Sequence, residues 1–155
     1  MPGLRFSRLV GALMILDLAI LGPGCKEELG PEQFVTARVS GVIKEGDQPV
    51  SGGWIEFLPV GGTAGNQRSA RIHPDGSFEA DKVPVGENAL RLVNAPIRLP
   101  RGNLIFGTYT TPIRRRIQDS AGVTLAIDLL EEAVRYQAAV QRTHNRVAED
   151  PGAGP

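Results

Sequence analysis

Few side chains in this sequence could perform acid–base or nucleophilic chemistry. The chain contains two histidines, His73 and His144, and one cysteine, Cys25. Neither an H-x-x-x-H nor an H-E-x-x-H spacing occurs, so no zinc motif of that kind is present. Enzymes need a nucleophile beside a base, paired carboxylates in a cleft, or a metal. We therefore predict no enzyme activity, no catalytic residue, no metal site and no cofactor. A cleft that brings His73 together with Asp75 or Glu79 would favour an enzyme instead.

Arginines are concentrated in one part of the chain. No acidic residue lies between Glu87 and Asp119, whereas this stretch holds Arg91, Arg98, Arg101, Arg114, Arg115 and Arg116. On a strand, Arg114 and Arg116 would share one face and Arg115 the other. Two interpretations stay open. The arginines bind an anionic polysaccharide, phospholipid headgroups or an acidic partner, or they protect a sheet edge and pair with Glu131 or Glu132.

Two aromatic residues are candidates for contact with a sugar. Trp54 is the only tryptophan of the chain. It would face outward if Ile55 and Phe57 face inward, and packing in the core or at an edge is the alternative. Tyr109 lies in a long connection at 94–111. We name Trp54, Tyr109, Arg114 and Arg116 as candidate ligand-binding residues for a carbohydrate or an anionic polymer.

Overall composition limits the class of partner. The formal net charge is +0, whereas dedicated nucleic-acid-binding domains are normally strongly basic, so we expect no nucleic-acid partner. A single cysteine also excludes an intramolecular disulfide.

The N-terminal segment has the layout of an export signal. Arg5 and Arg8 accompany an apolar run over 9–21, and small residues follow up to Cys25. The run is short for a membrane-spanning helix, which needs about 20 residues. A lone cysteine at this boundary resembles the lipobox of bacterial lipoproteins, in which a lipid joins the sulfur and cleavage makes the cysteine the first residue.

This resemblance implies a signal peptide at 1–24, lipidation of Cys25 and a polar tether at 25–33. The protein would then be exported and anchored by its lipid to a membrane of the cell envelope. A signal cut at another position, an uncleaved anchor and a wrong start codon remain as alternatives.

From Phe34 onward, apolar and polar residues alternate with period two, which is typical of half-buried strands. We predict strands at 34–43, 54–59, 68–72, from 78, 88–93, 113–117 and 123–129. Ile55, Phe57, Leu90 and Leu92 would face inward. Seven short strands separated by turns indicate an all-β, seven-stranded Greek-key β-sandwich over 34–129. In the long connection 94–111, the apolar residues 104–106 are candidates for packing beneath it.

The period changes after residue 129. Leu130, Val134 and Ala138 follow helical spacing, with acidic residues at the start and basic residues toward the end, so we predict an amphipathic helix at 130–148. It would either cap the sandwich or present a surface to a partner. Residues 149–155 would form a disordered tail.

Five short motifs occur in a fixed order. They are Val39-Ser40-Gly41-Val42-Ile43, Gly46-Asp47-Gln48-Pro49-Val50, Gly53-Trp54-Ile55-Glu56-Phe57-Leu58-Pro59, Pro74-Asp75-Gly76-Ser77-Phe78 and Val83-Pro84-Val85-Gly86. This series resembles the pattern of carboxypeptidase-regulatory-like (transthyretin-like) domains, in particular of small exported planctomycete lipoproteins that carry one such domain. The resemblance implies a β-sandwich over about 34–129 and a non-enzymatic interaction module at the cell envelope. The partner would be an envelope protein or a polysaccharide, and an accessory subunit of an envelope enzyme is a further alternative.

Overall fold

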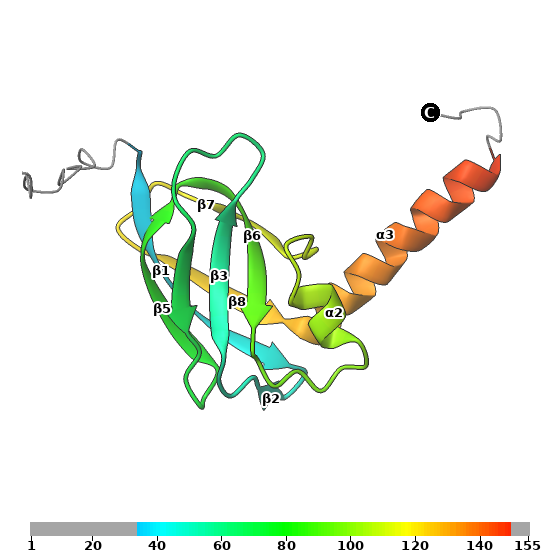
Figure 1. Cartoon of the computed structure of the whole chain (residues 1–155), viewed down its shortest axis with the longest axis horizontal. Helices are drawn as coiled ribbons and strands as arrows, with labels where there is room; N and C mark the ends of the chain where they lie inside the picture. Colours follow the sequence, from blue (N-terminus) through cyan, green and yellow to red (C-terminus); the bar gives the residue numbers. More distant parts are fainter. Residues whose placement is uncertain (1–33, 150–155) are drawn as a thin grey trace, which may run out of the picture. The chain divides into compact units, whose positions relative to one another are not determined.

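The computed structural model describes residues 34–149, which form eight strands in two sheets and two helices (Figure 1). The elements are β1 Thr36–Glu45, β2 Gln48–Pro49, β3 Trp54–Pro59, β4 Arg68–Arg71, β5 Ser77–Pro84, β6 Gly86–Val93, α2 Gly102–Phe106, β7 Arg114–Ile117, β8 Val123–Asp128 and α3 Leu129–Glu149. The predicted signal at 1–24, the tether at 25–33 with Cys25, and residues 150–155 lie outside the described residues.

The first sheet, called sheet A, is built around β1. Strand β5 pairs with β1 in antiparallel orientation from Thr36 to Val42, and β2 pairs with the end of β1. Strand β8 pairs with β1 in parallel orientation, with Val39 beside Val123. Parallel neighbours need a long crossover, and here the crossover contains all of the second sheet. The first and last strands of the described residues therefore meet in sheet A.

The second sheet, called sheet B, is antiparallel throughout and has the order β4-β3-β6-β7. Its predicted inward residues are confirmed, because Ile55, Phe57 and Leu90 are fully buried and Leu92 is 1% exposed. The ring centroids of Phe57 on β3 and Phe78 on β5 lie 6.1 Å apart, so sheet A and sheet B share one hydrophobic core.

Strand β2 was not predicted. Gly46 has a φ of 63° and begins a tight turn, after which Gln48 and Pro49 pair back onto Glu45 and Lys44. Proline has no backbone N–H, so it is tolerated in a strand only at an edge. A strand of two residues shows no hydropathy period, so no strand was predicted between 43 and 54.

The connection 94–111 contains a helix that was predicted only as local packing. Phe106 of α2 is fully buried, whereas Leu104 is 71% exposed. Strand β5 likewise extends through Val83 and Pro84, so a proline ends the strand and does not interrupt it. In both places tertiary contacts with the core prevail over the local signal of glycine or proline.

The start of α3 is held by Asp128. One carboxylate oxygen of Asp128 accepts hydrogen bonds from the backbone N–H groups of Leu130 (3.0 Å) and Gly46 (3.1 Å), and Lys44 lies 3.5 Å from the other oxygen. Burial acts to raise the pKa of Asp128, but these donors and Lys44 outweigh it and lower the pKa below its usual value. Asp128 is therefore an ionised N-cap that ties α3 to the β1–β2 turn.

Most of α3 has no contact with the core. Leu129 is fully buried and Glu132 is 5% exposed, whereas Val134 is already 65% exposed. The helix, orange to red in Figure 1, therefore covers the sheets with its first turns alone, and the capping role does not apply to the rest of it. It also includes Glu149, which was predicted to belong to the tail. Neither described helix is long and apolar enough to cross a membrane.

Candidate functional site

The candidate site is the outer face of sheet B, the face turned away from the core. Because Ile55 and Phe57 point inward, the alternating residues Trp54 and Glu56 point outward. Trp54 lies between Arg71 of β4 and Val93 of β6, and it is 46% exposed. The structure therefore places the tryptophan on the surface, with a cationic neighbour on one side.

The next row of this face carries a layered ion pair. Arg91 of β6 lies opposite Glu56, and its Nε donates to Glu56 Oε2 at 2.8 Å. The ring of Tyr109 lies over the guanidinium, with its centroid 3.8 Å from Arg91 Cζ. Burial acts to lower the pKa of Arg91, but Glu56 and Tyr109 outweigh it and raise this pKa. The guanidinium is thus a permanent cation held between a carboxylate and an aromatic ring.

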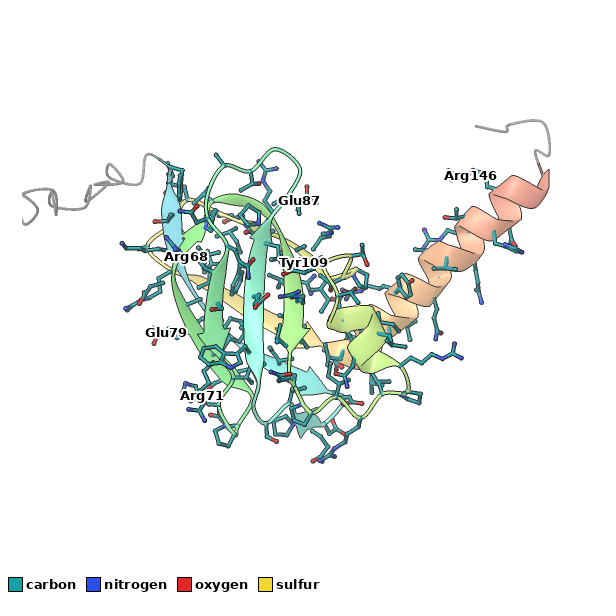
Figure 2. All side chains as sticks on the ribbon, viewed as in Figure 1. Arg68, Arg71, Glu79, Glu87, Tyr109 and Arg146 are labelled. Carbon is teal, nitrogen blue, oxygen red and sulfur yellow. The ribbon has the colours of Figure 1, made fainter. Side chains whose placement is uncertain are left out.

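Tyr109 belongs to the connection 94–111, and the structure brings it over sheet B (Figure 2). Its own side chain is 66% exposed, so one face of the ring is covered by Arg91 and much of the remainder meets solvent. Trp54 and Arg91 are diagonal neighbours on adjacent strands, a relation that places residues roughly 7–8 Å apart. Two of the four predicted ligand-binding residues, Trp54 and Tyr109, therefore lie on the same face of sheet B as Arg91.

The other two predicted residues lie on β7, farther along the same face. Arg114 is opposite Ala89 and Arg116 is opposite Glu87, and both arginines are exposed. Within the described residues neither arginine has an ion pair. The prediction that they share a face is confirmed by this register.

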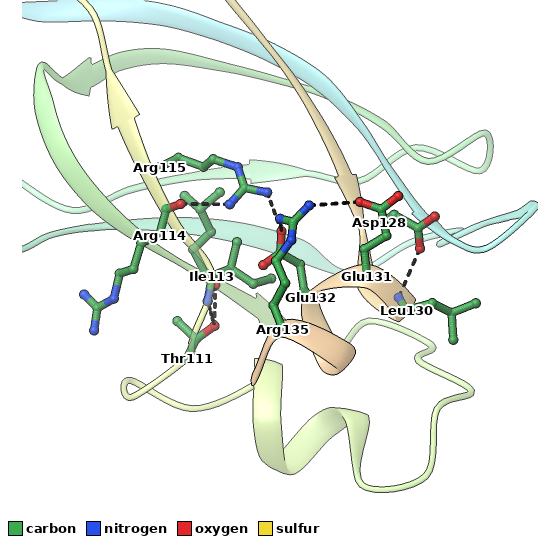
Figure 3. Close-up of polar contacts among 10 residues, drawn as sticks. Thr111, Ile113, Arg114, Arg115, Asp128, Leu130, Glu131, Glu132 and Arg135 are labelled. Carbon is green, nitrogen blue, oxygen red and sulfur yellow. Dashed lines mark hydrogen bonds and ion pairs between the residues drawn. The ribbon is translucent and has the colours of Figure 1, made fainter. Parts of the chain in front are cut away.

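Arg115 points the other way and serves the structure. Its Nη2 contacts Glu132 Oε1 of α3 at 2.5 Å, and Arg135 donates to the same oxygen at 2.9 Å (Figure 3). The predicted pairing of an arginine of this segment with Glu132 is confirmed. The arginine-rich stretch is thus divided: Arg91 and Arg115 are neutralised by acids from other elements, whereas Arg114 and Arg116 remain available.

Glu56 and Arg71 were not recognised as parts of this surface from the sequence. The period-two pattern placed Glu56 outward, but nothing in the sequence indicated that β6 would set Arg91 opposite it. Arg71 joins the face because β4 pairs with β3 in a register that places it against Trp54. Strand register depends on turn geometry and on the buried face, so it is not visible in the outward residues themselves.

Of the two carboxylates named above as possible partners of His73, Glu79 shares a depression with it. His73 and Glu79 line a shallow depression on sheet A together with Ser40, Ser77 and Thr124. The Ser77 hydroxyl donates instead to Asp75 Oδ1 at 2.6 Å, and Glu79 lies 3.5 Å from Arg38. Hydrogen bonds from the Ser77 hydroxyl and backbone also lower the pKa of Asp75.

His144 is exposed on α3, far along the sequence from that depression. In the part of the chain that the structure describes, no three metal-binding side chains come together. The arrangement that combines exposed aromatic rings with cationic groups is therefore the outer face of sheet B.

Comparisons of the chain with known protein families, with curated proteins and with solved structures found no significant match.

Proposed function

We propose that residues 34–149 bind an anionic polysaccharide through the outer face of sheet B and have no catalytic role. The exposed Trp54, set between Arg71 and Val93 and next to the Arg91–Tyr109 stack, is the observation that carries this proposal. Aromatic rings offer flat apolar surfaces against which sugar rings can pack, and arginine forms paired hydrogen bonds with carboxylates. The ligand class is a polymer of sugars that carry carboxylates, which Arg71, Arg114 and Arg116 would contact.

The fold part of the proposal is a Greek-key β-sandwich of the carboxypeptidase-regulatory-like type. Its support is the antiparallel sheet B, the core shared with sheet A, and the order of the five sequence motifs. The parallel pairing of β1 with β8 is a specific feature of this arrangement.

Truncation of Trp54 is the direct test of the ligand surface. We expect Trp54→Ala to weaken binding to polygalacturonate by about tenfold or more, the usual result of removing a central aromatic side chain from a binding surface. Isothermal titration calorimetry with polygalacturonate measures this change. Binding should also weaken as salt is raised, because exposed charges are screened.

Val42→Ala provides the matched control. Val42 is 45% exposed, almost the same as Trp54, but it lies on β1 of sheet A. This variant should bind polygalacturonate as the wild type does. Unchanged binding by Trp54→Ala would refute the proposed surface, and equal binding of neutral dextran would refute the anionic ligand class.

The location part of the proposal is export and attachment to the cell envelope through a lipid on Cys25. It is supported by the charged, apolar and small-residue segments that precede this cysteine. We expect the wild type to fractionate with membranes, with an intact mass that shows cleavage before an acylated Cys25. Cys25→Ala should be released or left unprocessed. Soluble and unlipidated protein in both cases would contradict the anchor.

A further inference from the structure

Strand β8 has a free edge with no charged residue or proline over 123–127. It pairs with β1 on one side, and no strand of the described residues pairs with its other side. The residues of this stretch are valine, threonine, leucine, alanine and isoleucine. The only charged residue of the strand is Asp128 at its end, and Asp128 already caps α3. A neutral strand edge of this kind is a template on which another strand can form.

The other strands at the sheet edges carry features that oppose such pairing. Strands β4 and β7 have two and three arginines within four residues. Strand β2 ends in Pro49, and β5 contains Glu79, Asp81 and Lys82. Charged side chains and proline are the usual means by which proteins keep their edges from pairing with other chains. Among the strands that the structure describes at sheet edges, β8 is therefore the least protected.

The backbone groups of β8 point alternately to β1 and to the free edge. A Cβ on Gly41 of β1 would overlap the carbonyl oxygen of Leu125, so this carbonyl points toward β1. Successive residues of a strand direct their N–H and C=O groups to opposite sides. The groups of Thr124 and Ala126 therefore point to the free edge, and both residues are exposed. Two donors and two acceptors are thus available to another strand.

The hydrophobic core is also open along this edge. Val123 and Leu125 pack against the core but are only partly buried, whereas Ile127 is 1% exposed. A strand added beside β8 would cover Val123 and Leu125 if it directed apolar side chains to the same face. The edge thus fits a strand in which apolar residues alternate with small neutral ones.

We propose that this strand is β8 of a second copy of the chain, paired antiparallel about a two-fold axis at Leu125. Thr124 then lies opposite Ala126 of the second copy, and each such pair exchanges two hydrogen bonds. Val123 lies opposite Ile127 of the second copy, and the two Leu125 side chains meet. Each copy therefore covers the open part of the other's core.

The register follows from the charges at the end of the strand. Pairing about Leu125 overlaps the whole neutral stretch 123–127 with itself. It leaves Asp128 outside the paired stretch, where its carboxylate keeps its contacts with Gly46 and Lys44. The contact belongs to sheet A, whereas the proposed ligand surface lies on sheet B.

Two properties of the edge favour a second copy over a different partner. A neutral stretch offers no charge by which to select an acidic or a basic peptide, whereas two copies of it meet without opposing like charges. The pairing is also isologous, so it uses the unprotected edge of both copies and closes as a dimer. Pairing of β8 with any other strand of a second copy would leave one unprotected edge exposed.

A cysteine at the two-fold axis tests the contact and its register. The two Leu125 positions form a pair without hydrogen bonds, whose Cα atoms lie about 4.5 Å apart in an antiparallel sheet. This spacing permits a disulfide. We expect the full chain with Leu125→Cys to give a disulfide-linked dimer under mild oxidation.

Val42→Cys is the matched control for the cross-link. Val42 is 45% exposed and lies beside Ala126, but it belongs to β1 and not to the free edge. This variant should give no more linked dimer than the wild type, which retains Cys25. If Leu125→Cys gave no more linked dimer than Val42→Cys, the proposal would be overturned.

A pair of lysine substitutions provides the second measurement. Leu125→Lys sets two ammonium groups opposite each other at the two-fold axis, and like charges in this position destabilise a strand pair. In sedimentation equilibrium of the full chain in density-matched detergent, we expect a dimer for the wild type and for Val42→Lys, and a monomer for Leu125→Lys. A monomeric wild type, a larger oligomer, or a dimer that survives Leu125→Lys would refute the proposal. Circular dichroism verifies the fold of both variants, and if Leu125→Lys is unfolded, the cross-linking result decides.

Discussion

Gly41→Ala is expected to lower the free energy of unfolding by about 3 kcal/mol, the upper part of the range for overpacking a core. Gly41 lies in the middle of β1, with Phe78 of β5 and Leu125 of β8 beside it. A Cβ at this position would overlap the carbonyl oxygen of Leu125 and lie 2.7 Å from Cζ of Phe78. The phenylalanine ring can turn aside, but the carbonyl belongs to the backbone of a paired strand. Relief of the overlap therefore requires β8 to move away from β1.

Gly122→Ala is the control for this substitution. A Cβ at Gly122 meets no atom within 4 Å, and substitutions at such open positions usually change stability by no more than about 0.5 kcal/mol. Urea denaturation followed by far-ultraviolet circular dichroism measures both variants. Equal stability of the two would show that the contact between β1 and β8 is looser than the structure has it.

Glu132→Ala should destabilise the protein by about 2 kcal/mol and release the first turns of α3. The Glu132 side chain is 7% exposed and contacts Arg115 and Arg135, whose side chains are 23% and 61% exposed. Removing one member of a fully buried pair costs about 3–5 kcal/mol, and the partial exposure of both arginines reduces this figure. Hydrogen exchange of the amides at the start of α3 should accelerate along with the loss of stability.

Glu131→Ala separates the buried contact from the general effect of losing a carboxylate. Glu131 also pairs with Arg135, at 3.0 Å, but both side chains are more than half exposed. Its loss should cost less than about 1 kcal/mol. Both substitutions introduce alanine, so helix propensity does not favour the wild type in either case. If Glu131→Ala destabilised the protein as much as Glu132→Ala, the contact with Arg115 would not be what holds α3.

A double variant shows whether the contact between Arg115 and Glu132 stabilises the protein through its charges. In Arg115→Leu/Glu132→Leu no charge is left unpaired, and apolar replacements of buried pairs are often neutral or stabilising. We expect it to recover most of the stability lost in Glu132→Ala. Urea denaturation measures the stability of the double variant. If none of the lost stability is recovered, the geometry of the ion pair itself positions α3.

The regular strands could be predicted from the sequence because their signal is local. In β3, Ile55 and Phe57 alternate with Trp54 and Glu56, and alternation alone decides which side chains enter a core. The outward position of Trp54 followed from the same pattern, as did the division of Arg114 and Arg116 from Arg115. The long amphipathic period predicted α3 to within one residue at each end.

The short and irregular elements were not predictable in this way. Strand β2 and helix α2 have two and five residues, too few for a hydropathy period to show. Their positions depend on a turn at Gly46 and on the burial of Phe106, and that burial requires the remainder of the core to be in place.

The sequence by itself thus determined the β-rich class, the inward faces of the main strands and the terminal helix, because each rests on contacts between near neighbours in the chain. Only the tertiary structure decided which side chains of different strands and helices lie next to one another. It set Arg91 between Glu56 and Tyr109, Arg71 beside Trp54, and β8 against β1. Strand register and long-range charge pairing depend on how sheet A, sheet B and α3 fit together, and no local pattern of residues records that fit.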